Sequence, residues 1–158
     1  MRLVTLRTPD GPAAAIERAE GRFVITDNSG NTYRDIGDLL RRESDWLSIA
    51  DRANTAAPPD ADVFRPVLQP GAVICVGLNY RTHILEMGRD LPSVPTYFGK
   101  LARSLTDPET AVELPQASDK VDYEGELCVV IGSGGRNIPE AKAWDAVAGL
   151  TLLNDVSM

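Results

Sequence analysis

The spacing of apolar and polar positions changes several times along the chain, and each spacing predicts a different element. Residues 1–33 hold short apolar or alternating segments separated by turn sequences, which predicts a series of strands. Residues 35–53 repeat apolar positions about every 3.6 residues with charges between them, which predicts a helix. A break at Ser44-Asp45 predicts a second helix start. The first third of the chain is therefore expected to be a small α/β domain.

The segment that follows this helical pattern has no periodicity. Residues 53–66 are rich in Ala, Pro and Asp, so we interpret them as a linker that ends near residue 66. This interpretation divides the chain into a small N-terminal domain with its linker, 1–65, and the first part of a second domain, 66–158.

The second part of the chain is expected to be β-rich. Its continuous apolar runs contain many β-branched residues, as buried strands do. We predict strands at 73–78, 123–132 and 150–155, helical segments at 79–88 and 141–149, and mostly irregular structure at 89–120, where prolines are frequent. The fold class expected for the whole chain is a β-rich α+β fold.

Composition narrows the range of partners. The 158 residues carry a formal net charge of −7, which argues against binding to nucleic acid or to anionic lipid. No run approaches the ~20 apolar residues that a membrane helix requires. The two cysteines, Cys75 and Cys128, lie inside apolar runs, which favours buried thiols over a disulfide and agrees with a cytoplasmic location.

Two carboxylates stand side by side in the segment that most clearly predicts a strand. Because side chains alternate along a strand, Glu124 and Glu126 share one face with Cys128. Like charges so close repel each other, and a divalent cation bound between them would remove that repulsion. The alternative is an edge strand whose polar end faces water. Asp155 follows another apolar strand and could face a ligand site, begin a turn or cap the next element.

His83, the only histidine, lies three residues before Glu86 in a predicted helical turn, so the two side chains share a face. A carboxylate beside an imidazole orients the ring and stabilises its protonated form, which suits a general base. The alternative is a polar pair on the protein surface. The sequence alone leaves both interpretations open.

Four segments together resemble the catalytic domain of the fumarylacetoacetate hydrolase family. The family pattern has a strand leading into N-Y-x-x-H-x-x-E, then an E-x-E strand, then a strand that ends in an acid followed by Ser or Thr. The matching segments are ICVGLNYRTHILEMG (74–88), PTYFGK (95–100), DYEGELCVVIG (122–132) and VAGLTLLNDVSM (147–158). The resemblance implies a mixed β-roll/β-sandwich catalytic domain, incomplete here, after a small N-terminal domain.

The resemblance also implies roles for individual residues. It makes Glu124, Glu126 and Asp155 the ligands of Mg²⁺ or Mn²⁺, with Ca²⁺ as a substitute in crystals. It makes His83 and Glu86 the dyad that activates water.

Two further positions are interpreted through the same family pattern. Lys100 matches a lysine to which we assign substrate binding. Asp107 replaces the glycine usual before Pro108, which we interpret as loop variation.

The activity implied by the family is cleavage of a carbon–carbon bond in a β-diketo acid, such as an acylpyruvate or a fumarylpyruvate-like substrate of aromatic catabolism. The alternatives are isomerisation or tautomerisation of 2-oxo or 2-hydroxy-dienoate diacids, and decarboxylation of oxaloacetate. An alternative of another class is an inactive truncated domain, or a subunit that needs a partner segment.

The expected partners are a small keto acid and a second copy of the chain in a homodimer. The family pattern continues beyond Ser157, so the C-terminal part of the same domain is a further expected partner.

Overall fold

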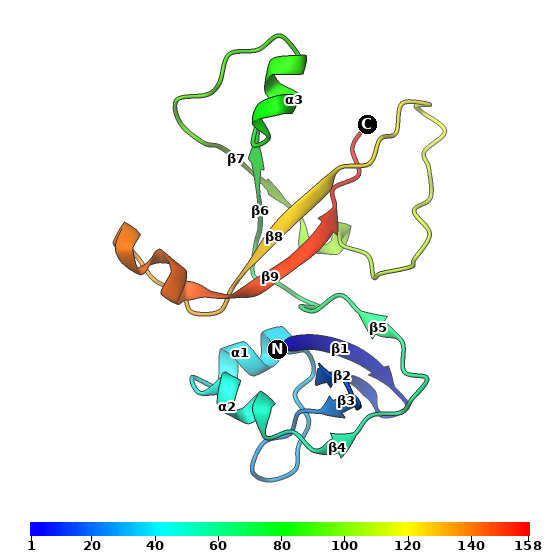
Figure 1. Ribbon diagram of the computed structural model, residues 1–158. Helices are drawn as coiled ribbons and strands as arrows, with labels where there is room; N and C mark the ends of the chain where they lie inside the picture. The colour runs from blue at the N-terminus through cyan, green and yellow to red at the C-terminus, as the bar shows by residue number, and fades with distance from the viewer. The chain divides into compact units, whose positions relative to one another are not determined.

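The computed structural model describes residues 1–158 and has a β-rich α+β fold (Figure 1). The chain forms two compact units: Met1–Leu68 together with Asp107–Met158, and Gln69–Thr106. No helix is long and apolar enough to cross a membrane. The domain boundary near residue 66 stays a prediction.

The predicted elements occur in the expected order with different bounds, and the strands at 55–56, 63–64 and 96–100 were not predicted. The elements are β1 (Arg2–Thr8), β2 (Gly11–Arg18), β3 (Gly21–Val24), α1 (Ile36–Arg42), α2 (Trp46–Asp51), β4 (Thr55–Ala56), β5 (Val63–Phe64), β6 (Val73–Gly77), α3 (Arg81–Glu86), β7 (Thr96–Lys100), a 3-10 helix (Ala102–Ser104), β8 (Gly125–Ile131), a 3-10 helix (Glu140–Ala146) and β9 (Val147–Asn154).

Five antiparallel strands form one sheet in the order β4-β3-β2-β1-β5. The predicted strands of residues 1–33 are confirmed as β1, β2 and β3. Tight turns join these strands, and a glycine follows each turn: Gly11 has φ +113° and Gly21 has φ +142°. Side chains with a Cβ rarely adopt such angles, so glycine is what permits both turns.

This sheet is buried on both faces. The helices α1 and α2, which confirm the predicted break at Ser44-Asp45, contribute Leu39 and Ala50 to a core with Ile16 and Ile25. The other face holds a second cluster of Val4, Leu6, Ala15 and Ala61. All buried apolar residues of the structure except Ile84 and Ala146 belong to residues 4–61.

The predicted linker at 53–66 is partly wrong. Its residues Thr55–Ala56 form β4 against β3, and Val63–Phe64 form β5 against β1. Strands of two residues are too short to show an alternating pattern, and their pairing depends on the neighbouring strands of the sheet. The Ala- and Pro-rich composition of this segment therefore gave no sign of β4 and β5, the two edge strands of the sheet.

The unit Gln69–Thr106 contains one pair of antiparallel strands, the α-helix α3 and the 3-10 helix Ala102–Ser104. β6 confirms the strand predicted at 73–78, and β7 pairs with it, placing Val76 opposite Tyr97. β7 lies inside the segment predicted to be irregular. Of the four prolines that suggested irregular structure, Pro92 and Pro95 precede this strand and Pro108 and Pro115 follow it, so none removes one of its hydrogen bonds.

The strands β8 and β9 form a second antiparallel pair, with an irregularity between Val130 and Ile131. Both predicted strands are confirmed. The helical segment predicted at 141–149 is confirmed only in part, because a 3-10 helix covers Glu140–Ala146 and β9 begins at Val147. Val147 pairs with Ile131, so the tertiary pairing overrides the helical composition of this segment.

Candidate active site

The pairing of β8 with β9 brings the three predicted metal ligands to one face. Glu126 lies opposite Leu153 and Gly125 opposite Asn154. The register continues beyond the strands, because the backbone N–H of Asp155 donates to the carbonyl oxygen of Glu124 at 2.7 Å. Opposite residues share a face and so do residues two apart along a strand. Glu124, Glu126 and Asp155 are therefore neighbours at one end of the ladder.

Further hydrogen bonds fix the backbone around these acids. The N–H of Glu124 donates to the side-chain Oδ1 of Asn154 at 3.1 Å. Asp122 and Ser157 exchange two backbone bonds of 3.0 and 3.2 Å. Nothing in the sequence pattern pointed to Asn154. Its side chain holds the backbone of Glu124 because Asn154 lies opposite Gly125 in the strand pair.

The three acids differ in exposure. Asp155 is buried at 9% relative exposure, Glu126 is half-buried and Glu124 is exposed. Their carboxylate oxygens are the donors that Mg²⁺ and Mn²⁺ prefer, so the chemistry of the donor set fits such an ion. No three His, Cys, Asp or Glu side chains converge closely enough in this structure to hold a metal ion. The backbone register thus brings the three acids to one face, and their side chains would have to rotate to meet around an ion.

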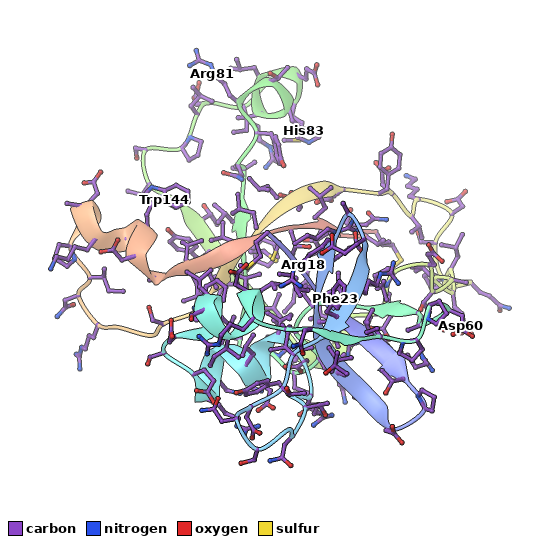
Figure 2. All side chains as sticks on the ribbon, turned by 60° about the horizontal axis from the view of Figure 1, so that its bottom comes forward. Arg18, Phe23, Asp60, Arg81, His83 and Trp144 are labelled. Atoms are coloured by element: carbon purple, nitrogen blue, oxygen red, sulfur yellow. The ribbon has the colours of Figure 1, made fainter.

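His83 and Glu86 lie on α3, whose buried residue is Ile84 at 2% exposure. Both side chains of the predicted dyad are exposed, and they form no hydrogen bond or ion pair with each other. Figure 2 shows His83 and Arg81 projecting from different sides of the helix. His83 and Glu86 are thus accessible to solvent, and their role as a catalytic dyad stays a prediction.

The chain enters α3 through a turn at Leu78. This residue has φ +53°, a left-handed conformation that a side chain with a Cβ seldom adopts. It directly precedes the Asn79-Tyr80 of the matched motif, and a cavity of about 230 Å³ lies beside it. Leu78, Asn79 and Pro95 are among the lining residues, and neither His83 nor Glu86 is.

Lys100 ends β7 opposite Val73 and is half-buried. It belongs to the same unit as His83 and Glu86, whereas the three acids belong to the other unit. The two halves of the predicted site therefore lie in different units. Their union in one catalytic centre stays a prediction.

Both cysteines are reduced thiols, as predicted, but they are half-buried and not buried. Cys128 shares a strand face with Glu126, and burial raises the pKa of its thiol above the ordinary value. A raised pKa keeps this thiol protonated at neutral pH, so it acts as a small apolar side chain beside the acids.

The fold and the site define a class: a β-rich α+β chain in which an antiparallel strand pair carries three acids on one face. A family model described as the C-terminal region of fumarylacetoacetate (FAA) hydrolase matches residues 72–158. The chain belongs to the fumarylacetoacetate hydrolase family.

Proteins similar to the chain are named after different enzyme activities: a tautomerase, an isomerase and a hydrolase. The human protein named mitochondrial oxaloacetate tautomerase FAHD2A is 37% identical over 99% of this chain and 53% of its own length. The fumarylacetoacetate hydrolase of Exiguobacterium antarcticum superposes with a TM-score of 0.75 at 27% identity, over 99% of this chain and 56% of that one. The 5-carboxymethyl-2-hydroxymuconate delta-isomerase of Mycobacterium smegmatis gives a TM-score of 0.72 at 27% identity, over 99% and 55%. The chain thus spans about half the length of these relatives.

Proposed function

We propose that this chain is part of an enzyme that tautomerises or isomerises a small 2-oxo diacid at a divalent metal ion. The observation that carries the proposal is the register of β8 and β9, which places Glu124, Glu126 and Asp155 on one face. The metal would be Mg²⁺ or Mn²⁺. When bound, this ion supplies Lewis-acid polarisation of the substrate's keto and carboxylate oxygens.

Tautomerisation is preferred to hydrolysis because of the names of the relatives. One is named an oxaloacetate tautomerase and another a hydroxymuconate isomerase. Both reactions move a proton and a double bond, and neither needs a positioned water molecule. Cleavage of a carbon–carbon bond in a β-diketo acid is the second candidate, favoured by the likeness to the Exiguobacterium hydrolase.

The roles of this chain's own residues follow from their chemistry. His83 would take the proton from the carbon next to the keto group and hold it at a ring nitrogen, and the proton would then reach the oxygen of the enol. Glu86, three residues later on α3, would orient the imidazole and stabilise its protonated form. The ammonium group of Lys100 would bind the distal carboxylate of the substrate. No atom is gained or lost in this reaction.

We further propose that the active enzyme includes polypeptide equivalent to the half of the relatives that this chain does not span. One face of the β8–β9 pair is apolar and exposed, including Leu127 at 57%, Leu150 at 54% and Leu152 at 82%. Exposed apolar faces of this kind mark surfaces that another polypeptide covers. A second copy of the chain, in a homodimer, and a cytoplasmic location belong to the same proposal.

The test measures metal affinity and turnover separately. We expect Mn²⁺ binding, followed by calorimetry, and Mn²⁺-dependent loss of the enol absorbance of oxaloacetate when the chain is combined with a segment equivalent to the rest of a relative. His83→Ala should lower turnover roughly 100- to 10,000-fold and leave Mn²⁺ affinity unchanged. Glu126→Ala should abolish both.

Glu140→Ala is the matched control, since Glu140 is an exposed glutamate that begins a 3-10 helix outside the proposed site. It should change neither Mn²⁺ affinity nor turnover. Full Mn²⁺ affinity in Glu126→Ala would reject the ligand assignment. Unchanged turnover in His83→Ala would reject the assignment of the base.

A further inference from the structure

One arginine joins the two points at which the chain leaves and re-enters its first compact unit. The chain leaves this unit after Leu68 and returns at Asp107. Nε and Nη2 of Arg65 donate to the carbonyl oxygen of Leu68 at 3.3 and 3.0 Å. Nη1 and the backbone N–H of the same residue donate to Oδ1 of Asp107 at 2.7 and 3.2 Å.

The exit point is also held from its other side. The N–H of Leu68 donates to Oδ2 of Asp35 at 3.0 Å, and Asp35 is buried at 2% exposure. Two residues earlier, the carbonyl oxygen of Pro66 accepts from Oγ1 of Thr5 at 2.7 Å and from the N–H of Ile36 at 3.1 Å. Both backbone groups of Leu68 are therefore anchored to the first unit.

The chemistry of this junction depends on the residue types. A guanidinium group is planar and offers donors in several directions, so it can bind a carbonyl and a carboxylate together, which an ammonium group does less well. The side chains of Arg65 and Asp107 are half-buried, at 26% and 24% exposure. A glycine at position 107 would offer no carboxylate. The residue that the sequence suggested was loop variation is thus half of an ion pair.

We propose that Arg65 and Asp107 are positioning residues that close the two ends of segment 69–106. Closing the ends of a segment reduces the conformations open to it, and small displacements of catalytic groups cost rate. Segment 69–106 carries His83, Glu86 and Lys100. The link to catalysis rests on the proposed function of these residues, whereas the closure itself does not.

Hydrogen–deuterium exchange of the full 158-residue chain, read by peptide mass spectrometry, tests the closure. Arg65→Lys keeps the positive charge but loses the planar guanidinium that binds Leu68 and Asp107 together. It should speed exchange roughly tenfold in peptides 66–72 and 103–110. Asp107→Asn should have a smaller effect, because an amide oxygen can still accept from the backbone of residue 65. The matched control is Arg2→Lys, whose ion pair with Glu17 (2.6 Å) joins β1 to β2.

In Arg65→Lys and Asp107→Asn we expect faster exchange at both ends of segment 69–106 and unchanged exchange in β1–β3. In Arg2→Lys we expect no change at the two ends of the segment. Wild-type exchange at these ends in both Arg65→Lys and Asp107→Asn would overturn the proposal. Equal acceleration in β1–β3 would also overturn it, because that pattern reports general destabilisation.

Turnover tests the second half of the proposal. In the active enzyme, Arg65→Lys should lower kcat roughly tenfold while KM and Mn²⁺ affinity stay unchanged, since the acids lie outside segment 69–106. Faster exchange with an unchanged kcat would refute positioning and keep the closure. If the wild type lacks activity, the proposed function fails and the exchange experiment still decides the closure.

Discussion

The five-stranded sheet and the β8–β9 pair bury their apolar side chains to opposite degrees. In the sheet, Leu6 and Ala14 are fully buried, and clusters cover both faces. In the β8–β9 pair, Leu127, Leu152 and Ile131 are exposed at 57%, 82% and 59%. Both regions are antiparallel and rich in apolar residues, so strand pairing alone does not explain the difference.

The difference lies in what covers each sheet. Two short helices and the segment around Ala61 supply the apolar cover of the five-stranded sheet from its own neighbourhood in the sequence. The β8–β9 pair has a 3-10 helix beside β9, and that helix leaves Trp144 exposed at 74% (Figure 2). An isolated pair of strands is only marginally stable unless a third strand or a helix packs against it. The sheet therefore forms a core by itself, whereas the pair leaves one apolar face exposed.

The largest effect expected is a contrast between one leucine from each region. Leu6→Ala should lower the free energy of unfolding by about 3 kcal/mol, because it leaves a cavity in a closed core. Leu152→Ala should change it by less than about 0.5 kcal/mol, because an exposed side chain leaves no cavity. Urea unfolding followed by circular dichroism measures both values.

The contrast between the two leucines can be tested further by adding to the chain a polypeptide equivalent to the half of the relatives that it does not span. Leu152→Ala should then weaken the association between the two pieces. A loss of several kcal/mol for Leu152→Ala in the chain alone would mean that this face is already covered. Sedimentation velocity would show whether a second copy covers it.

A medium effect is expected at Asp35, the N-cap of α1, whose side chain also binds Leu68, where the chain leaves the first compact unit. Asp35 accepts from the N–H groups of Asp38 (2.6 Å) and Leu68 (3.0 Å). Asp35→Ala should cost about 2 kcal/mol of unfolding free energy, since it removes both bonds at a buried position. The matched control is Asp45→Ala, because Asp45 holds the same position before α2 and makes no capping bond with its side chain. Similar losses in the two variants would contradict the capping role.

The smallest effect expected is a pH dependence in the sheet region. Burial, followed by the hydrogen bond to Glu43 at 2.8 Å, raises the pKa of Tyr33 from 10.0 to about 12. Because the folded pKa lies above the unfolded one, the stabilisation is complete below pH 10 and is lost as the pH rises through about 12. The urea midpoint should fall between pH 10 and 12 in the wild type and fall less in Tyr33→Phe. Equal declines would show that Tyr33 does not cause the pH dependence.

The sequence predicted those elements whose periodicity is long enough to read. The strands of residues 1–33 and the runs at 73–78 and 123–132 were confirmed, since their alternation or continuous apolar character is local. The edge strands β4 and β5 and the start of β9 at Val147 were missed or misplaced. Each of these depends on a partner strand distant in the sequence, and such pairing leaves little trace in local composition.

The same division holds for the site. By itself the sequence predicted the candidate site residues, namely the acids at 124, 126 and 155 and the His83–Glu86 motif, and through their motifs it predicted the family, which the family model confirms. The tertiary structure decided that Glu124 lies opposite Asp155, and that Asp107 binds Arg65. Side-chain chemistry and spacing are properties of a short segment, whereas register and ion pairs between residues about 30 or 40 apart exist only once the chain has folded.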